Sequence, residues 1–261
     1  MKQCHMIYIA MLLSFIVQKI DAQNTSCEIP LMVFISEQDE SLPQAAEKQL
    51  SNKLIKAATE NGLTADYSYA QFVIFPEFSV LEKSILPGPP RSFIYDIELT
   101  LFIGDYFGKK TFSSTTLNIK GVGENETKAY INAIRKINPK SIAIQEFIED
   151  SKAKIISYYN SNYPNIIKKA QALSNQKQYD EAMFLLMAIP ECSEGYQAAL
   201  KAAANVYQLY VDAMCDYNLN RARMAWGSQQ NRYGAEEAGE YLTHIYPDAK
   251  CYPDAISLRS E

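Results

Sequence analysis

The chain has 261 residues, enough for one or two domains, and its 25 Lys and Arg are outnumbered by 30 Asp and Glu, giving a formal net charge of −5. A negative charge without a basic cluster argues against a nucleic-acid-binding protein and against a protein held on anionic membrane surfaces. No segment after residue 22 is apolar over the roughly 20 residues that a membrane-spanning helix needs.

The first 23 residues, MKQCHMIYIAMLLSFIVQKIDAQ, have the pattern of a secretory signal peptide. Lys2 supplies an early positive charge, the apolar run 6–17 is too short to cross a bilayer, and the small residue Ala22 precedes Gln23. We therefore predict export to the periplasm or the outer membrane, with cleavage between Ala22 and Gln23. The alternatives are a buried N-terminal helix and a lipoprotein acylated at Cys27, although the residues before Cys27 depart from a lipobox.

The N-terminal half, residues 23–140, is expected to be an α/β domain. A predicted helix has an N-cap at Ser41 and a left-handed C-cap at Asn61-Gly62, and a predicted strand is broken or bulged at Pro76. The expected elements, in order, are strand 30–35, helix 41–62, strand 70–86, strand 92–104, strand 111–121 and helix 124–137. Residues 92–121 form a hairpin, so the sheet is antiparallel or mixed and is covered by helices. Together with a helical second half, this order predicts an α+β fold.

The C-terminal half, residues 141–261, carries no strand signals and is expected to be all-α. Six residues recur 56 positions later, in two helix-ending contexts that both reach a proline, which indicates a duplicated helical hairpin. The six pairs are Glu181 and Glu237, Ala182 and Ala238, Leu186 and Leu242, Ile189 and Ile245, Tyr196 and Tyr252, and Ala199 and Ala255.

One long helix is predicted between the two hairpins, because no Pro or Gly interrupts residues 196–226. Its apolar face is expected along residues three or four apart. These residues are Tyr196, Leu200, Ala203, Tyr207, Tyr210, Met214 and Tyr217. Most tyrosines of the helical half are expected to pack with their hydroxyls at the surface, and exposed members could anchor a partner.

Several segments resemble known bacterial envelope proteins. The order of elements in the N-terminal half resembles the small α/β domains of TolB, of the curli-secretion lipoprotein and of the outer-membrane activators of penicillin-binding proteins. QYDEAMFLL, with Ala170 twelve residues before Ala182, resembles the second half of a tetratricopeptide repeat, although the period of 56 is longer than that family's.

Across nearly the whole chain, the segments AQNTSCEIPLMVF, ILPGPPR, GVGENETKAYINA and IYPDAKCY resemble an uncharacterised exported family found in Bacteroidetes. This resemblance implies an envelope location and the two-part architecture, and it leaves the chemistry open.

Four cysteines follow the signal peptide, and none has the Cys-x-x-Cys spacing of a zinc or redox site. Disulfides and buried free thiols are both open for them. Cys215 lies about 14 residues, or about 21 Å, before the long helix ends, and a return helix of about 13 residues brings the loop with Cys251 back level with it. We therefore predict a Cys215–Cys251 disulfide, and Cys192 lies too far along the helix to pair with Cys215.

The sequence offers few groups for catalysis. His244 is expected at a solvent-facing edge, and a disulfide explains Cys251 better than a catalytic pair with His244 does. GVGENE lacks the third glycine and the Lys-Ser/Thr of a phosphate loop, so a turn before a helix explains it. We predict no catalytic residue, no metal ligand and no cofactor.

One loop, ILPGPPRSF at residues 85–93, has the features of a recognition site. Pro87, Pro89 and Pro90 stiffen it, Gly88 allows a tight turn, and Arg91 offers a planar guanidinium that can bind a carboxylate. A stiff connector between two strands explains the same residues.

The sequence favours a non-enzymatic exported protein that binds or scaffolds another envelope protein through its helical-repeat surface. The alternative is a module that binds peptidoglycan, a glycan or a small ligand in the α/β domain near Arg91. An enzyme is the third reading. The oligomeric state and the identity of the partner stay open.

Overall fold

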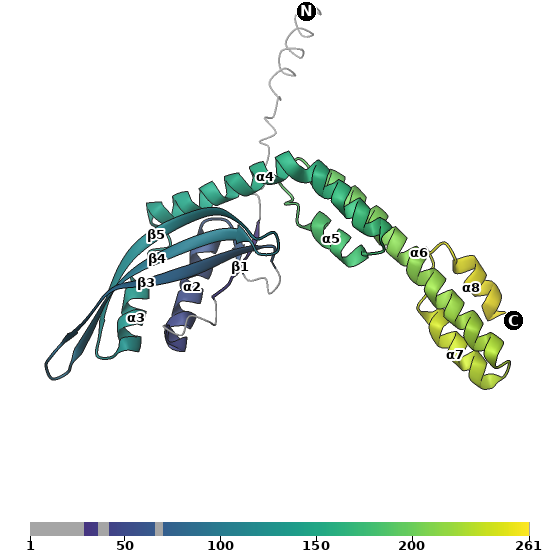
Figure 1. Cartoon of the computed structure of the whole chain (residues 1–261), viewed down its shortest axis with the longest axis horizontal. Helices are drawn as coiled ribbons and strands as arrows, with labels where there is room; N and C mark the ends of the chain where they lie inside the picture. The colour runs from purple at the N-terminus through teal and green to yellow at the C-terminus, as the bar shows by residue number, and fades with distance from the viewer. Residues whose placement is uncertain (1–28, 36–41, 66–69, 261) are drawn as a thin grey trace, which may run out of the picture.

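The computed structural model describes residues 29–35, 42–65 and 70–260 (Figure 1). A mixed sheet with helices forms the N-terminal half and helices alone form the C-terminal half, so the predicted α+β fold class is confirmed. The predicted cleavage site at Ala22 and Gln23, and Cys27, lie outside the described residues. None of the helices that the structure describes has the length and hydropathy to cross a membrane.

The sheet has five strands in the order β2-β1-β3-β4-β5. β1 runs parallel to β2 and β3, whereas β3, β4 and β5 form an antiparallel meander. Their bounds are β1 Pro30–Val33, β2 Thr64–Ala65, β3 Phe72–Leu86, β4 Ser92–Asp105 and β5 Lys110–Gly123. β3 and β4 extend beyond the helices as a protruding hairpin (Figure 1).

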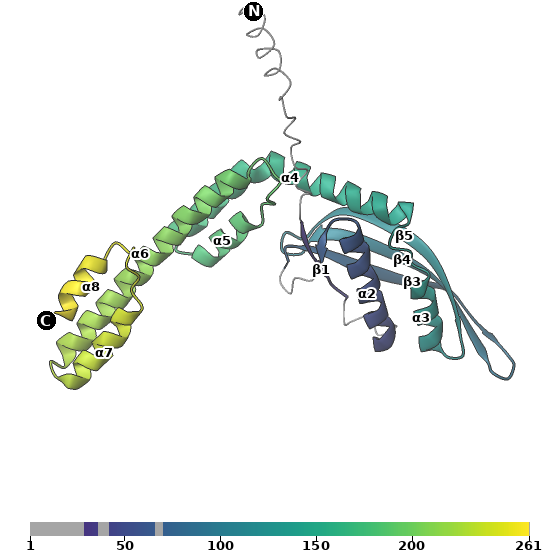
Figure 2. The same ribbon diagram turned by 180° about the vertical axis from the view of Figure 1, so that it is seen from behind.

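Alternation along β4 decides which face of the sheet the helices cover. Its odd-numbered residues Tyr95, Ile97, Leu99, Leu101 and Ile103 are buried in the main hydrophobic core. The helices α2 (Gln44–Glu60) and α3 (Glu126–Arg135) lie over that face (Figure 2). The even-numbered residues, among them Glu98 and Thr100, lie on the opposite face and are only half-buried.

The predicted irregularity in β3 lies four residues beyond the expected position. β3 passes through Pro76 without a break, and its bulge falls between Val80 and Glu82. The Ile74 carbonyl accepts a hydrogen bond from Phe34 N–H at 3.0 Å, so the backbone of Ile74 faces β1. Pro76 faces the same side two residues on, past the end of β1, where its missing N–H breaks no ladder bond.

Gly121 and Gly123, which we expected in a turn before a helix, belong to the end of β5 instead. A Cβ on Gly121 would overlap the Ala129 carbonyl oxygen, and one on Gly123 would overlap the Ala129 nitrogen. The two glycines therefore allow α3 to lie directly against β5. Asn125 starts α3, because its side chain accepts a hydrogen bond from Lys128 N–H at 2.8 Å.

Five helices follow: α4 Ile142–Asn175, α5 Tyr179–Met187, α6 Tyr196–Ser228, α7 Arg232–Thr243 and α8 Tyr252–Arg259. Pro164 lies inside α4, and the helix bends there (Figure 1). The first half of α4 lies along the β5 side of the sheet, where Asp150 accepts a hydrogen bond from Ser113 Oγ at 2.5 Å. The second half runs alongside α5 and α6.

The core of the sheet continues into α4. Ile144, Phe147, Ile148, Ile155 and Tyr159 are buried in the same cluster as the strands. The predicted domain boundary at residue 141 therefore falls immediately before a helix whose first half contributes to the sheet's core.

The predicted duplication is visible in the backbone. Ile189, Ser193, Tyr196 and Ala199 donate N–H hydrogen bonds to Leu186, Pro190, Ser193 and Gly195, and the same four bonds recur 56 residues later from Ile245, Ala249, Tyr252 and Ala255. α5 followed by the start of α6 thus has the same local structure as α7 followed by α8. The likeness to tetratricopeptide repeats stays a prediction.

The face of α6 that packs inside the protein differs from the expected one. Its first half buries Ala199, Ala202, Ala203 and Val206, and its second half buries Val211, Cys215, Leu219 and Ala222. From Tyr207 onward the predicted apolar line faces outward instead, with Tyr207, Tyr210 and Tyr217 exposed.

Candidate functional site

A cleft of about 950 Å³ opens where the sheet meets the helical half. Its walls come from three elements: the β4–β5 turn at residues 105–108, the middle of α4, and α5. The bend at Pro164 carries the second half of α4 and α5 past the end of the sheet, so the cleft depends on both halves of the chain.

Asp105 lies deep in the cleft, only 8% exposed, and organises the β4–β5 turn. Its Oδ1 accepts hydrogen bonds from Phe107 N–H at 3.1 Å, from Gly108 N–H at 2.8 Å and from Gln71 Nε2 at 2.5 Å. An aspartate at the first position of a tight turn commonly caps it in this way. The carboxylate is therefore engaged in holding the turn.

Tyr159 of α4 reaches the same carboxylate from the helical side. Its burial, and next the negative charge of Asp105, raise the pKa of the Tyr159 hydroxyl above its usual range. The hydroxyl stays protonated and hydrogen-bonds to Asp105. The two titratable groups deepest in the cleft thus connect the turn to α4.

Aromatic rings make up much of the wall. The rings of Phe107, in the turn, and Phe184, on α5, meet edge to face with centroids 4.4 Å apart. Tyr158 lies beside Tyr159 with centroids 5.2 Å apart, and Lys110 Nζ lies 3.9 Å from the centre of the Tyr158 ring. The Phe107–Phe184 contact joins the sheet to α5.

Polar side chains surround the opening. Asn162, Asn165 and Lys169 come from α4, and Asp180 and Glu181 come from the first turn of α5. All but Asn162 are exposed. One lysine faces two carboxylates at this rim, so the cleft has no excess of positive charge that would favour an anionic ligand.

The predicted recognition loop lies far from this cleft. Pro87, Gly88, Pro89, Pro90 and Arg91 are exposed at the tip of the β3–β4 hairpin. The cleft borders the other ends of the same two strands, about 45 Å away at 3.3 Å per residue. The structure therefore does not bring Arg91 to the site that it shows.

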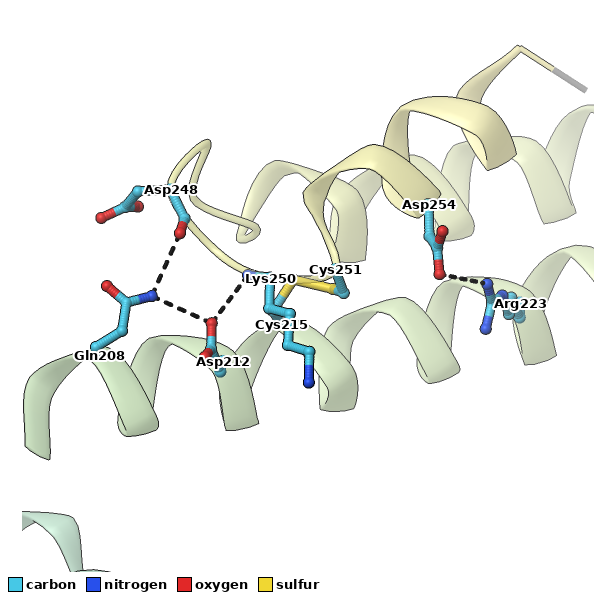
Figure 3. Close-up of a disulfide and its surroundings, with 8 residues drawn as sticks. All are labelled: Gln208, Asp212, Cys215, Arg223, Asp248, Lys250, Cys251 and Asp254. Atoms are coloured by element: carbon cyan, nitrogen blue, oxygen red, sulfur yellow. Dashed lines mark hydrogen bonds and ion pairs between the residues drawn. A yellow bond between two sulfur atoms is a disulfide. The ribbon is translucent and has the colours of Figure 1, made fainter. Parts of the chain in front are cut away.

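Cys215 and Cys251 form a disulfide, with Cα atoms 5.9 Å apart (Figure 3). The loop that carries Cys251 also lies on α6 through polar contacts, because Asp212 accepts from Lys250 N–H at 2.9 Å and Gln208 Nε2 donates to the Asp248 carbonyl at 3.3 Å. α6 continues through 218–220 unbroken, so the levels of the two helices match.

The remaining cysteine and histidine candidates have structural surroundings. Cys192 is itself disulfide-bonded, so it is not a partner of Cys215 or Cys251. His244 is exposed at the C-terminal end of α7, and Cys251 has no thiol to pair with it. Among the residues that the structure describes, no group of three or more His, Cys, Asp or Glu could hold a metal ion.

Sequence reasoning did not single out the residues of the cleft. The one local signal was the DYFGKK turn, where Asp105 stands at a position typical of turn capping. Phe184 and Asn165 look like ordinary helix residues, because only the bend in α4 brings them opposite the turn.

No protein-family model matches the chain, and no curated protein is similar enough to count as a relative. Among solved structures, similar chains include a minor lipoprotein of Acinetobacter baumannii, at 19% identity over 48% of this chain and 91% of the other, with a TM-score of 0.27. A protein described as a homolog of the neuraminyllactose-binding hemagglutinin of Helicobacter pylori has 11% identity over 49% of this chain and 92% of its own, with a TM-score of 0.31. PelC of Paraburkholderia phytofirmans has 16% identity over 47% of this chain and 85% of its own, with a TM-score of 0.25. At such low TM-scores these likenesses give no ground for assigning a fold family or a function.

Proposed function

We propose that the chain is an exported binding protein without catalytic activity, and that its ligand occupies the cleft between the β4–β5 turn, α4 and α5. The observation that carries the proposal is the cleft itself, which combines aromatic walls with a polar rim. Its deepest titratable groups, Asp105 and Tyr159, serve the fold, which fits a site that binds rather than reacts. Export rests on the signal-peptide pattern of residues 1–22.

The ligand that suits this lining best is a short neutral glycan. Pyranose rings present an apolar C–H face, which stacks on aromatic rings such as Phe107 and Phe184, and a girdle of hydroxyls. Asn162, Asn165, Asp180 and Glu181 offer acceptors for those hydroxyls, and the carboxamides and Lys169 offer donors. A purely apolar ligand would leave these polar groups without partners, and a polyanion would meet more carboxylates than lysines.

A direct binding experiment tests the proposal. The mature chain is titrated calorimetrically with chitotetraose, cellotetraose and maltotetraose, and at least one is expected to bind saturably. Phe184→Ala should weaken that binding about tenfold or more, because it removes a stacking surface. The control is Leu209→Ala, an exposed apolar residue of α6 outside the cleft, which should bind as the unaltered chain does.

Two results would contradict the proposal. One is the absence of binding to all three sugars, and the other is binding that Phe184→Ala leaves unchanged. Binding of a fluorescent acyl-chain probe in place of the sugars would identify an apolar ligand instead.

A protein partner on the helical half is a second candidate function, and one observation favours it. α6 exposes Tyr207, Tyr210, Tyr217 and Met224, and tyrosines of this kind often anchor protein interfaces.

A further inference from the structure

Six residues of α6 form a line along its outer surface, which we call the α6 stripe. They are Tyr207, Tyr210, Met214, Tyr217, Arg221 and Met224. Their spacing alternates between three and four residues, as the seam positions of a coiled coil do. Five of the six are exposed and Met214 is half-buried. Tyr217 and Met224 are 55% and 65% exposed, although apolar seam residues of a lone helix usually face a partner.

The exposure is not due to a helix that lacks a core. The neighbouring face of the same segment already packs on α7, α8 and the Cys251 loop through Val211, Cys215, Leu219 and Ala222. The disulfide and the Asp212–Lys250 bond fix that packing (Figure 3). The α6 stripe is thus a second apolar face on a rigid helix, free to receive another helix.

We propose that a second copy of this chain covers the α6 stripe, with the two α6 helices antiparallel about a two-fold axis that passes between Met214 and Tyr217. In this register each residue meets the one whose number completes the same sum. Tyr207 faces Met224 of the second copy, Tyr210 faces Arg221, and Met214 faces Tyr217. The two-fold axis repeats each contact in reverse, as a self-complementary interface requires.

The chemistry of these layers favours the antiparallel register. Two layers and their symmetry mates place a methionine sulfur against a tyrosine ring, a contact worth about 0.3–1.5 kcal/mol. The third places the Arg221 guanidinium on the Tyr210 ring, a cation–π contact. Arg221 already donates to the Tyr241 hydroxyl at 3.2 Å, which holds the guanidinium in position. A parallel seam would instead set Arg221 against its own copy.

The open side of the α6 stripe also permits close approach. Ala213 and Asn220 flank it there, and neither brings a charge that the contact would have to desolvate. The six layers cover 17 residues, about 26 Å of helix. This length is comparable to short natural coiled-coil contacts, so we expect a reversible dimer that is independent of any ligand in the cleft.

Thiol cross-linking tests the register. Tyr207→Cys and Met224→Cys are made in separate mature chains, mixed and oxidised. The mixture is expected to give a cross-linked dimer, because positions 207 and 224 share a layer. Each variant alone should stay uncross-linked, because its two thiols would lie about 26 Å apart. Cross-linking of the Tyr207→Cys variant with itself would indicate a parallel seam and overturn the proposal.

Sedimentation of the unaltered mature chain tests the dimer without a variant. We expect a concentration-dependent mass that rises to twice that of one chain. Tyr217→Glu should weaken association about tenfold or more, whereas the matched control Tyr233→Glu, on the exposed surface of α7, should leave it unchanged. A chain that stays monomeric at all concentrations, or equal effects of the two variants, would refute the proposal.

Discussion

Gly121 and Gly123 show how a residue without a side chain determines the position of a helix. Both would overlap the backbone of α3 if they carried a Cβ, so their role lies in the contact between β5 and α3. From the sequence, two glycines before a helix predict a turn, because only local chemistry is visible there. The close approach of a helix from the same face of the sheet is a tertiary fact, which the spacing of the glycines does not encode.

Replacing Gly121 tests this role. Gly121→Ala should lower the free energy of unfolding by about 3 kcal/mol, because the methyl group would force α3 away from β5. Gly239→Ala is the control, since nothing lies within 4 Å of its Cβ position and it lies inside α7. Alanine there should raise the stability by up to about 1 kcal/mol. Urea unfolding of both variants measures the difference, and equal stabilities would show that α3 yields without cost.

Tyr159 should make the protein sensitive to alkali. Burial raises the pKa of its hydroxyl in the folded chain, whereas in the unfolded chain the hydroxyl titrates near its ordinary value of 10.0. Above about pH 10 the unfolded state therefore binds fewer protons than the folded state, and stability falls as the pH rises. Below pH 10 both states keep the proton, so the contribution of this group is constant.

The matched variants are Tyr159→Phe and Tyr233→Phe, one buried and one 75% exposed. The free energy of unfolding, followed from pH 8 to pH 11, should fall less steeply above pH 10 for Tyr159→Phe than for the unaltered chain. Tyr233→Phe should follow the unaltered chain. Parallel curves for Tyr159→Phe and the unaltered chain would mean that the buried hydroxyl ionises as easily as an exposed one.

At the scale of elements, α6 separates what periodicity can predict from what it cannot. Its length was predictable because no Pro or Gly interrupts it, and the duplicated hairpins were predictable because identical residues return at one offset. Its buried face was predicted wrongly beyond Ala203. The neighbours of α6 change along its length, from α4 and α5 to α7 and α8, and the apolar line from Tyr207 has the period of any helix contact.

The level of Cys215 and Cys251 could be derived because it depends on lengths alone. Both helices rise 1.5 Å per residue, so counting from the shared turn gives their relative height. The cleft admits no such derivation, because its position depends on the bend at Pro164 and on the packing of α4 over the sheet.

Removing the disulfide should loosen the end of the molecule selectively. The Cys215→Ala, Cys251→Ala variant loses a link across a sequence separation of 36, worth about 2–4 kcal/mol. Amide exchange should accelerate in α7 and α8 while β4 keeps its protection, because the core of the sheet lies in a separate cluster. Peptide mapping of the unaltered chain without reduction should recover the two cysteines linked. Free thiols there, or exchange that rises equally in β4, would contradict the expectation.

At the scale of the whole molecule, the two halves share α4. Its first half completes the core of the sheet, and its second half packs on α5 and α6. The sequence places a boundary at residue 141 because strand signals stop there, yet a helix can belong to two units at once. The cleft follows from this sharing, since one continuous helix carries Tyr159 to the end of the sheet and Asn165 to the side of α5.

This sharing changes what is expected of a fragment that ends at residue 140. Such a fragment lacks Ile144, Phe147, Ile148 and Ile155, all buried against the strands. Each contributes about 1.5–3 kcal/mol by burial, so the loss is on the order of 10 kcal/mol and comparable to the total stability of a domain. It would also expose Phe72, whose ring packs edge to face on Tyr159 with centroids 5.9 Å apart.

We therefore expect the fragment 23–140 to lack a cooperative transition, and the fragment 23–163, which ends before Pro164, to unfold cooperatively. The longer fragment keeps the buried residues of α4 and the hydrogen bond from Lys152 Nζ to the Asn61 carbonyl at 2.6 Å, which ties α4 to the end of α2. Urea unfolding followed by circular dichroism compares the two, and near-ultraviolet signals report whether the aromatic side chains are packed. Cooperative unfolding of the shorter fragment, with a midpoint equal to that of the longer one, would show that the sheet, α2 and α3 form a complete core without α4.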